Sequence, residues 1–200
     1  VKGTRVRAWQ GIPDITVDNA EQITVLERPP WDADMDLTNH AVDVPLSDVV
    51  AGPSRVGMKT RGMLVSVRED SGFIKRCTEC RRVLRDGACF DHGANEGTED
   101  VRLRLVVDHE GVTAAVLVNK EASLAALGLS LEEMRGKVEE LGDVGFVQHV
   151  RELLLGRNIA VSGRSIVDDQ GAMVLADGFE VEAHDAQMRA SELRMQWGWA

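Results

Sequence analysis

The stretch that decides the fold is VRLRLVVDHEGVTAAVLV, residues 101–118. Side chains alternate in character along residues 101–108, so that one face carries Val101, Leu103, Leu105 and Val107. The opposite face carries Arg102, Arg104 and Val106. Because successive side chains of a strand point to opposite faces, this pattern predicts a strand with one buried face. Gly111 then turns the chain into a second predicted strand over residues 112–118.

The strands and helices predicted on either side of this pair of strands indicate the fold class by their order along the chain. Residues 63–67 read as a preceding strand, and residues 157–167 and 172–182 read as a final hairpin around Asp168-Asp169-Gln170-Gly171. Helical stretches are expected between them at residues 121–127, 131–141 and 146–155, the second opened by a capping box from Ser130 to Glu133. Five strands with helices between the third and the fourth are typical of an OB-fold barrel. The predicted class is therefore mainly β (α+β).

All the cysteines of the chain fall within CTECRRVLRDGACFDHG, residues 77–93. The spacing is Cys77-x2-Cys80-x8-Cys89-x2-His92, and a two-residue gap lets both members of a pair reach one ion. Four soft or borderline ligands fill a tetrahedral shell and leave no position for water or substrate. The sequence therefore predicts a structural zinc site with Cys77, Cys80, Cys89 and His92 as ligands.

Composition narrows the class of protein. An odd number of cysteines in one cluster argues against a disulfide framework and predicts a reducing compartment, the cytoplasm. The longest apolar runs are too short to span a bilayer, so no membrane partner is expected. The remaining histidines are isolated, and the sequence has no Ser/His/Asp, phosphate-loop or paired-carboxylate pattern. We therefore expect a binding protein and not an enzyme.

Charge is distributed unevenly along the chain. The formal net charge is −10, yet residues 55–85 carry 9 basic and 3 acidic side chains. A cationic segment within an acidic protein indicates either a solvated face or a local site for a polyanion.

The stretch RGMLVSVREDSGFIKRCTECRRVLRDGACFDHG, followed by VRLRLVVDHEGVTAAVLV, resembles the zinc-bearing OB domain of archaeal replication protein A. In that family a zinc ribbon is inserted between the first two strands of the barrel. The hairpin TRVRAWQGIPDITV resembles the closing strands of a preceding OB-fold. The resemblance implies binding of single-stranded DNA, with little sequence preference, in replication, recombination and repair. It also implies association with the nucleoid and with other OB-fold domains or subunits, through a C-terminal helix.

These observations divide the chain into expected parts. They are a terminal hairpin over residues 1–27, a linker over 28–55 with a short helix near 46–50, an OB-fold domain over 56–183 with its zinc ribbon at 73–93, and a C-terminal helix over 184–200.

Candidate nucleic-acid contacts follow from the position of the basic residues. In OB-folds the face of strands two and three contacts the nucleic acid. Arg102 and Arg104 lie on the polar face of the second predicted strand and are therefore candidate contacts. Arg68, Lys75 and Arg76 flank the start of the ribbon, within expected reach of phosphates. Aromatic residues are few, at 4% of the chain, and Phe73 is the expected stacking residue beside these cations.

Two other functions fit the same residues. The OB-fold and the C-terminal helix would serve as an assembly module that holds subunits or domains together. An OB-fold that binds RNA is the second alternative.

Overall fold

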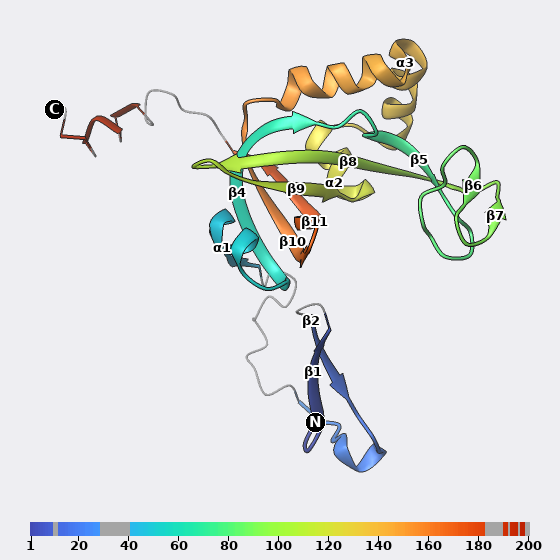
Figure 1. Cartoon of the computed structure of the whole chain (residues 1–200), viewed down its shortest axis with the longest axis vertical. Coiled ribbons are helices and arrows are strands. Elements are labelled where there is room, and N and C mark those ends of the chain that lie inside the picture. Colours follow the sequence, from blue (N-terminus) through green and yellow to red (C-terminus); the bar gives the residue numbers. More distant parts are fainter. Residues whose placement is uncertain (10–11, 29–40, 183–189, 192, 196, 199–200) are drawn as a thin grey trace.

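A computed structural model of the chain describes residues 1–9, 12–28, 41–182, 190–191, 193–195 and 197–198. Its central feature is a barrel of five long strands (Figure 1). They are β4 (Arg55–Val67), β8 (Thr98–His109), β9 (Val112–Val118), β10 (Asn158–Asp168) and β11 (Gly171–Val181).

The pairing of these strands closes the sheet on itself. Strand β8 pairs antiparallel with β4 and with β9, and β9 runs parallel to β11. Strand β11 pairs antiparallel with β10, and β10 returns to β4. Closure requires the strands to bend, and β10 does so at a bulge at Gly163, whose φ is 150°. A Cβ at Gly163 would lie 2.2 Å from the Leu175 carbonyl oxygen, so glycine is required there. The predicted five-stranded topology is confirmed.

The barrel interior is filled by the apolar face predicted from the alternating pattern. Val101, Leu103, Leu105 and Val107 of β8 are each at most 1% exposed. They meet buried residues of the other strands, among them Leu64, Val116, Ile159 and Val174.

Helices connect β9 to β10, where the sequence predicts three helical stretches. Helix α2 (Lys120–Leu127) begins at Asn119, whose side chain accepts a 2.9 Å hydrogen bond from the Ala122 amide. Helix α3 (Leu131–Leu154) begins with the expected capping box, Ser130 to Glu133. The backbone of Gly142 is non-helical, with φ 70° and ψ 168°, and it divides α3 into the two helical stretches expected at 131–141 and 146–155. Met134 and Phe146, one from each half, are buried in the core.

Part of the segment predicted as a linker packs on the barrel. Strand β3 (Val42–Asp43) pairs in parallel with Met58 and Lys59 of β4, and helix α1 (Leu46–Ala51) follows. Leu46 and Val49 are 1% and 0% exposed and belong to the main hydrophobic core. The short helix expected near residues 46–50 is therefore present, but it belongs to the barrel and not to a linker. Sequence alone does not show this, because a six-residue helix that buries only Leu46 and Val49 is too short to give a clear periodicity.

Replacing Leu46 with alanine is expected to destabilise the barrel by about 2–4 kcal/mol, because it leaves a cavity in a core that cannot fully collapse. Urea unfolding followed by circular dichroism measures this change. The matched control is Val42→Ala in the same segment, whose side chain is 66% exposed and whose replacement should cost less than about 0.5 kcal/mol. Equal effects of the two variants would mean that α1 does not stabilise the barrel.

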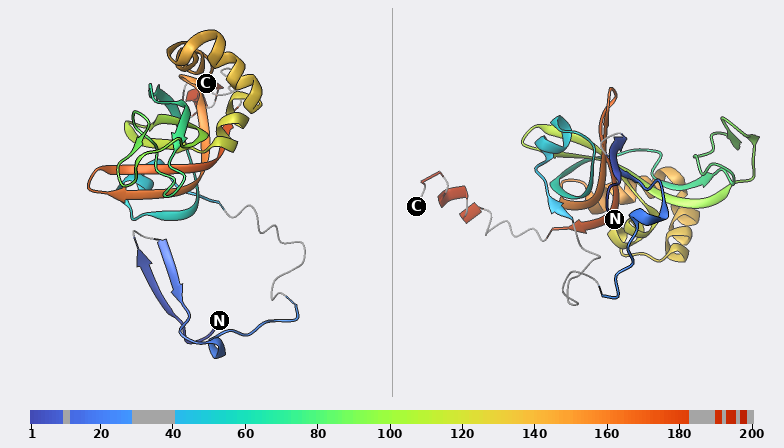
Figure 2. Two further views of the ribbon diagram at one scale, coloured as in Figure 1. Left: turned by 90° about the vertical axis from the view of Figure 1, so that its right-hand side faces the viewer. Right: turned by 90° about the horizontal axis from the view of Figure 1, so that it is seen from below.

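The remaining elements lie outside the barrel. Strand β5 (Gly72–Arg76) pairs with the first half of β8 and leads into the ribbon, which contains β6 (Ala88–Cys89) and β7 (Gly93–Ala94). Figures 1 and 2 show the ribbon projecting from the end of β5 and β8, and α3 lying against the barrel. The predicted N-terminal hairpin is formed by β1 (Arg5–Trp9) and β2 (Ile12–Thr16), followed by a 3-10 turn, η1 (Ala20–Gln22). Its membership of a preceding OB-fold stays a prediction.

The C-terminal segment is described in part. Of the helix predicted over residues 184–200, residues 190, 191 and 193–195 are helical, and residues 184–189 lie outside the described residues. None of the helices in the described part of the chain has the length and hydropathy needed to cross a bilayer.

Candidate metal centre and nucleic-acid interface

The four predicted ligands converge on one point of the ribbon. The Sγ atoms of Cys77, Cys80 and Cys89 and a ring nitrogen of His92 all lie within 4.8 Å of one another. Sγ of Cys80 lies 3.5 Å from Sγ of Cys89, and Nδ1 of His92 lies 3.5 Å from Sγ of Cys77. Metal–sulfur bonds of about 2.3 Å place tetrahedral sulfur ligands roughly 3.8 Å apart, so these separations fit a single tetrahedral ion.

Both halves of the cluster are built in the same way. The backbone N–H groups of Cys80 and Glu79 point at the Cys77 sulfur and lower the pKa of that thiol. At Cys89 desolvation raises the pKa, but the backbone N–H groups of Asp91 and His92 outweigh it and lower the pKa. In each half the donors are the second and third residues after the cysteine. Such a loop stabilises a thiolate, the form of cysteine that binds a metal.

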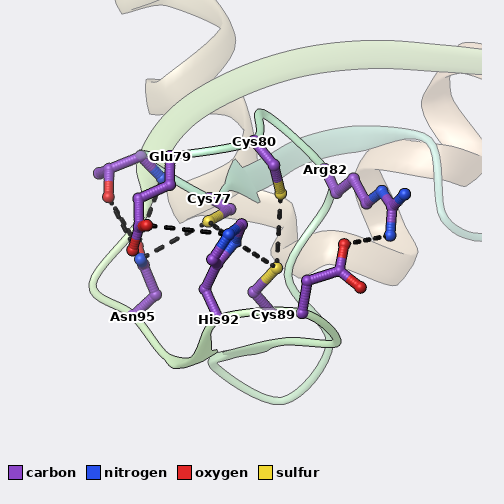
Figure 3. A network of polar contacts seen from close by, with 9 residues as sticks. Cys77, Glu79, Cys80, Arg82, Cys89, His92 and Asn95 are labelled. Carbon is purple, nitrogen blue, oxygen red and sulfur yellow. Dashed lines mark hydrogen bonds and ion pairs between the residues drawn. The ribbon is translucent and has the colours of Figure 1, made fainter.

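Polar contacts around the ligands hold this geometry (Figure 3). A Glu79 carboxylate oxygen lies 3.7 Å from Nε2 of His92, on the side of the ring away from the sulfurs. Nδ1 of His92 lies 3.5 and 3.6 Å from the sulfurs of Cys77 and Cys89, so this nitrogen is the one placed to act as the ligand. Arg82 forms an ion pair with Asp91, which ties the two halves together. Asn95 approaches Cys77 through Nδ2, at 3.6 Å, and accepts a 2.9 Å hydrogen bond from the Gly97 amide. The donor set and its surroundings therefore fit a closed metal site with no position for a substrate.

The second candidate site lies on the outer face of β8. Arg102 and Arg104 both bind one carboxylate oxygen of Asp70, at 2.8 and 2.5 Å. Desolvation raises the pKa of Asp70, but the hydrogen bond and charge of Arg104 and the charge of Arg102 outweigh it and lower the pKa. Burial lowers the pKa of Arg102, whose buried Nε has no hydrogen-bond acceptor among the described residues. The two predicted arginines are thus neighbours that share a single counterion.

An apolar floor lies beside these arginines. In the barrel register Arg104 is opposite Leu117 of β9, Leu117 is opposite Leu175 of β11, and Leu175 is opposite Arg164 of β10. Met173 and Ala115 form the next row on the same outer face. This surface, which we call the groove, contains two adjoining hollows of about 240 and 390 Å³ that share Arg102 and Leu117. Arginines therefore border a mainly apolar floor on both sides, and Asp177 is the acidic residue that lines the larger hollow.

Of the six predicted contact residues, four meet at the groove. Arg68, Arg102 and Arg104 line the smaller hollow, and Arg76 lines the larger one with Arg164. Arg76 also forms an ion pair with Asp100. Arg68 forms no ion pair with any carboxylate in the described part of the chain.

Phe73 and Lys75 lie on a different face of the sheet from Arg102 and Arg104, although all four residues line one open cavity at the edge strand β5. Phe73 is opposite Val101 and Lys75 is opposite Glu99, so both share the face of β8 that turns away from the groove. There Phe73 packs against the hydrophobic core, and the Arg135 guanidinium lies 5.8 Å from its ring centre. The register of β5 against β8 puts odd and even residues on opposite faces, so Phe73 does not share the groove with these arginines, and its stacking on a base stays a prediction. Only an open cavity around the edge strand β5 is lined by residues of both faces.

Sequence reasoning missed the floor and Arg164. The runs VTAAVLV and AMVLA are apolar on both faces, and such runs usually indicate strands buried on both sides. Here Ala115, Leu117, Met173 and Leu175 are only half-buried. A barrel buries only the inner face of each strand. Apolar residues on the outer face as well were therefore the sequence signal for this floor.

Comparison with known proteins agrees with this topology. A structure described as a replication protein A heterotrimer bound to single-stranded DNA contains a chain that matches with a TM-score of 0.51 and 12% identity, over 80% of this chain and 41% of that one. The barrel is an OB-fold. A second similar chain comes from yeast RPA bound to single-stranded DNA, with a TM-score of 0.42 and 16% identity, over 69% of this chain and 85% of that one.

The present chain thus spans about two fifths of the first of these chains. No protein-family model and no curated protein sequence matches this sequence.

Proposed function

We propose that this chain binds single-stranded DNA along the groove, without strong sequence preference, as part of a replication protein A-type protein. The observation that carries the proposal is the apolar floor bordered by arginines on the outer face of β8, β9, β11 and β10. Arginines attract phosphates, and an apolar floor receives the faces of unpaired bases of any sequence. The similarity of the fold to replication protein A supports this proposal.

The metal in this proposal is zinc, held by Cys77, Cys80, Cys89 and His92. A set of three thiolates and one imidazole suits zinc, and a closed shell gives the ion a structural role. The chain performs no chemical step, acts in the cytoplasm at the nucleoid, and serves replication, recombination and repair. Other OB-fold domains or subunits are its protein partners, through the C-terminal helix.

Fluorescence anisotropy of labelled oligo-dT across a salt series tests the proposal. Binding to the groove should weaken linearly on a log–log plot, by about 0.7 in slope for each phosphate contact. Tighter binding of a matched RNA would favour the RNA-binding alternative. If neither nucleic acid binds at low salt, the assembly role is favoured.

Asp70 makes a specific prediction about this site. Its carboxylate lies between Arg102 and Arg104, where a phosphate would bind, so Asp70→Asn is expected to raise the affinity for oligo-dT by roughly 3- to 10-fold. The salt dependence should also steepen by up to about 0.7, because one more phosphate contact forms. Anisotropy titrations at several salt concentrations measure both effects.

The control is Glu69→Gln, which changes the net charge equally in the same turn. Glu69 and Asp70 are both exposed, but of the two only Asp70 forms an ion pair with these arginines. If Asp70→Asn binds no more tightly than Glu69→Gln, Asp70 does not compete with phosphate.

A further inference from the structure

The most exposed large apolar side chain among the described residues is Phe90, whose relative exposure is 97%. It follows the ligand Cys89 directly in the ribbon. A metal held at Cys89 and His92 would fix the backbone on both sides of Phe90 and so keep this side chain at the surface of the ribbon. An aromatic side chain has only two rotatable bonds and loses little entropy on binding, and aromatic rings are common at binding sites.

Basic residues surround this ring. Phe90 lines an open cavity of about 500 Å³ together with Arg82 and Arg85, and no acidic residue lines it. Arg82 is paired with Asp91, whereas Arg85 forms no ion pair among the described residues. A ring next to a free guanidinium suits a ligand that has both flat bases and phosphates.

The cavity at Phe90 is connected to the groove. Val83 and Arg85 line both this cavity and a larger one, of about 870 Å³, that Arg102 and Arg104 also line. The larger cavity has four basic residues, Lys75, Arg85, Arg102 and Arg104, against three acidic ones, Asp70, Asp86 and Asp143. Hollows that share lining residues, with an excess of basic over acidic side chains in the larger one, therefore lie between the barrel and the ribbon.

We propose that a DNA strand bound in the groove continues over the ribbon, where Arg85 contacts a phosphate and Phe90 stacks on a base. This inference rests on the proposed function and adds a second contact region to it. It gives the ribbon a binding role besides its structural one. It also implies that the ribbon contacts only strands long enough to extend beyond the barrel.

Oligonucleotide length separates the two regions experimentally. We would compare dT strands of roughly 8 and roughly 20 nucleotides, since one OB-fold covers about 4–16 nucleotides. Phe90→Leu should weaken binding of the longer strand by about 5-fold or more, as expected for one lost base–aromatic stack, and leave the shorter strand within 2-fold. Phe90→Trp should retain wild-type affinity for both, because it keeps an aromatic ring.

Two controls accompany these variants. Val144→Ala removes another exposed apolar side chain, 85% exposed on α3, and should not change binding to either strand. The metal content of each variant, measured by mass spectrometry, shows that the ribbon is intact.

Three results would overturn the inference. They are wild-type affinity of Phe90→Leu for the longer strand, an equal loss for both strands, and an equal loss in Phe90→Trp and Phe90→Leu. If the wild-type chain binds neither strand, the proposed function itself fails, and this outcome is distinct from the other three.

Discussion

Removal of the proposed zinc ion is expected to unfold residues 77–93 while the five barrel strands remain folded. In this segment the only fully buried side chains are those of Cys77 and Cys89, which are ligands. Strands β6 and β7 have two residues each, too few to hold the segment by backbone pairing. The segment therefore has no hydrophobic core of its own, and metal binding must supply its folding free energy, on the order of 10 kcal/mol for structural zinc sites.

Hydrogen exchange with and without a chelator measures this effect. Amides of residues 77–93 should lose their protection after chelation, and amides of β8, β9 and β10 should keep theirs. The variant His92→Cys should retain one zinc per chain, since four thiolates also bind zinc, whereas His92→Ala should bind it far more weakly. Persistent protection of residues 77–93 in the metal-free chain would show that zinc does not fold the ribbon.

Replacement of both Arg102 and Arg104 by glutamine is expected to reduce the affinity for oligo-dT by at least about 30-fold near 0.1 M salt. Both side chains lie at the groove, and each hydrogen bond from a charged donor contributes about 1.5–3 kcal/mol. The log–log salt slope should fall in magnitude by roughly 1.4, which corresponds to two lost phosphate contacts. Anisotropy titrations measure both quantities.

The matched control is the double variant Lys59→Gln with Arg61→Gln. These two residues are also cations on the outer face of a barrel strand, β4, and they also pair with carboxylates, those of Glu180, Glu182 and Asp43. They line neither hollow of the groove. If the control loses as much affinity as the double variant of Arg102 and Arg104, binding depends on overall charge and not on the groove.

The barrel and the metal cluster could be predicted from sequence because their signals are local. Alternation along residues 101–108 fixes which side chains face inward, and burial of Val101 and Leu103 agrees with it. Pairs of ligands separated by two residues can meet without help from distant parts of the chain, and the four ligands do converge.

The composition of the groove could not be predicted, because it depends on contacts between distant residues. Phe73 faces away from Arg102 because of the register of β5 against β8, which no local pattern specifies. Arg164 and Leu175 reach the groove only through barrel closure. The pairing of Asp70 with two arginines depends on the path of the turn before β5.

Titration of labelled oligo-dT with the zinc-loaded chain tests the central claim, binding in the groove, most directly. We predict saturable binding at about 50 mM salt that weakens linearly with log salt, with a slope of roughly −2 to −3 when about three or four of the arginines that line the groove contact phosphates. Absence of binding at that salt concentration, or binding whose affinity does not change with salt, would contradict it.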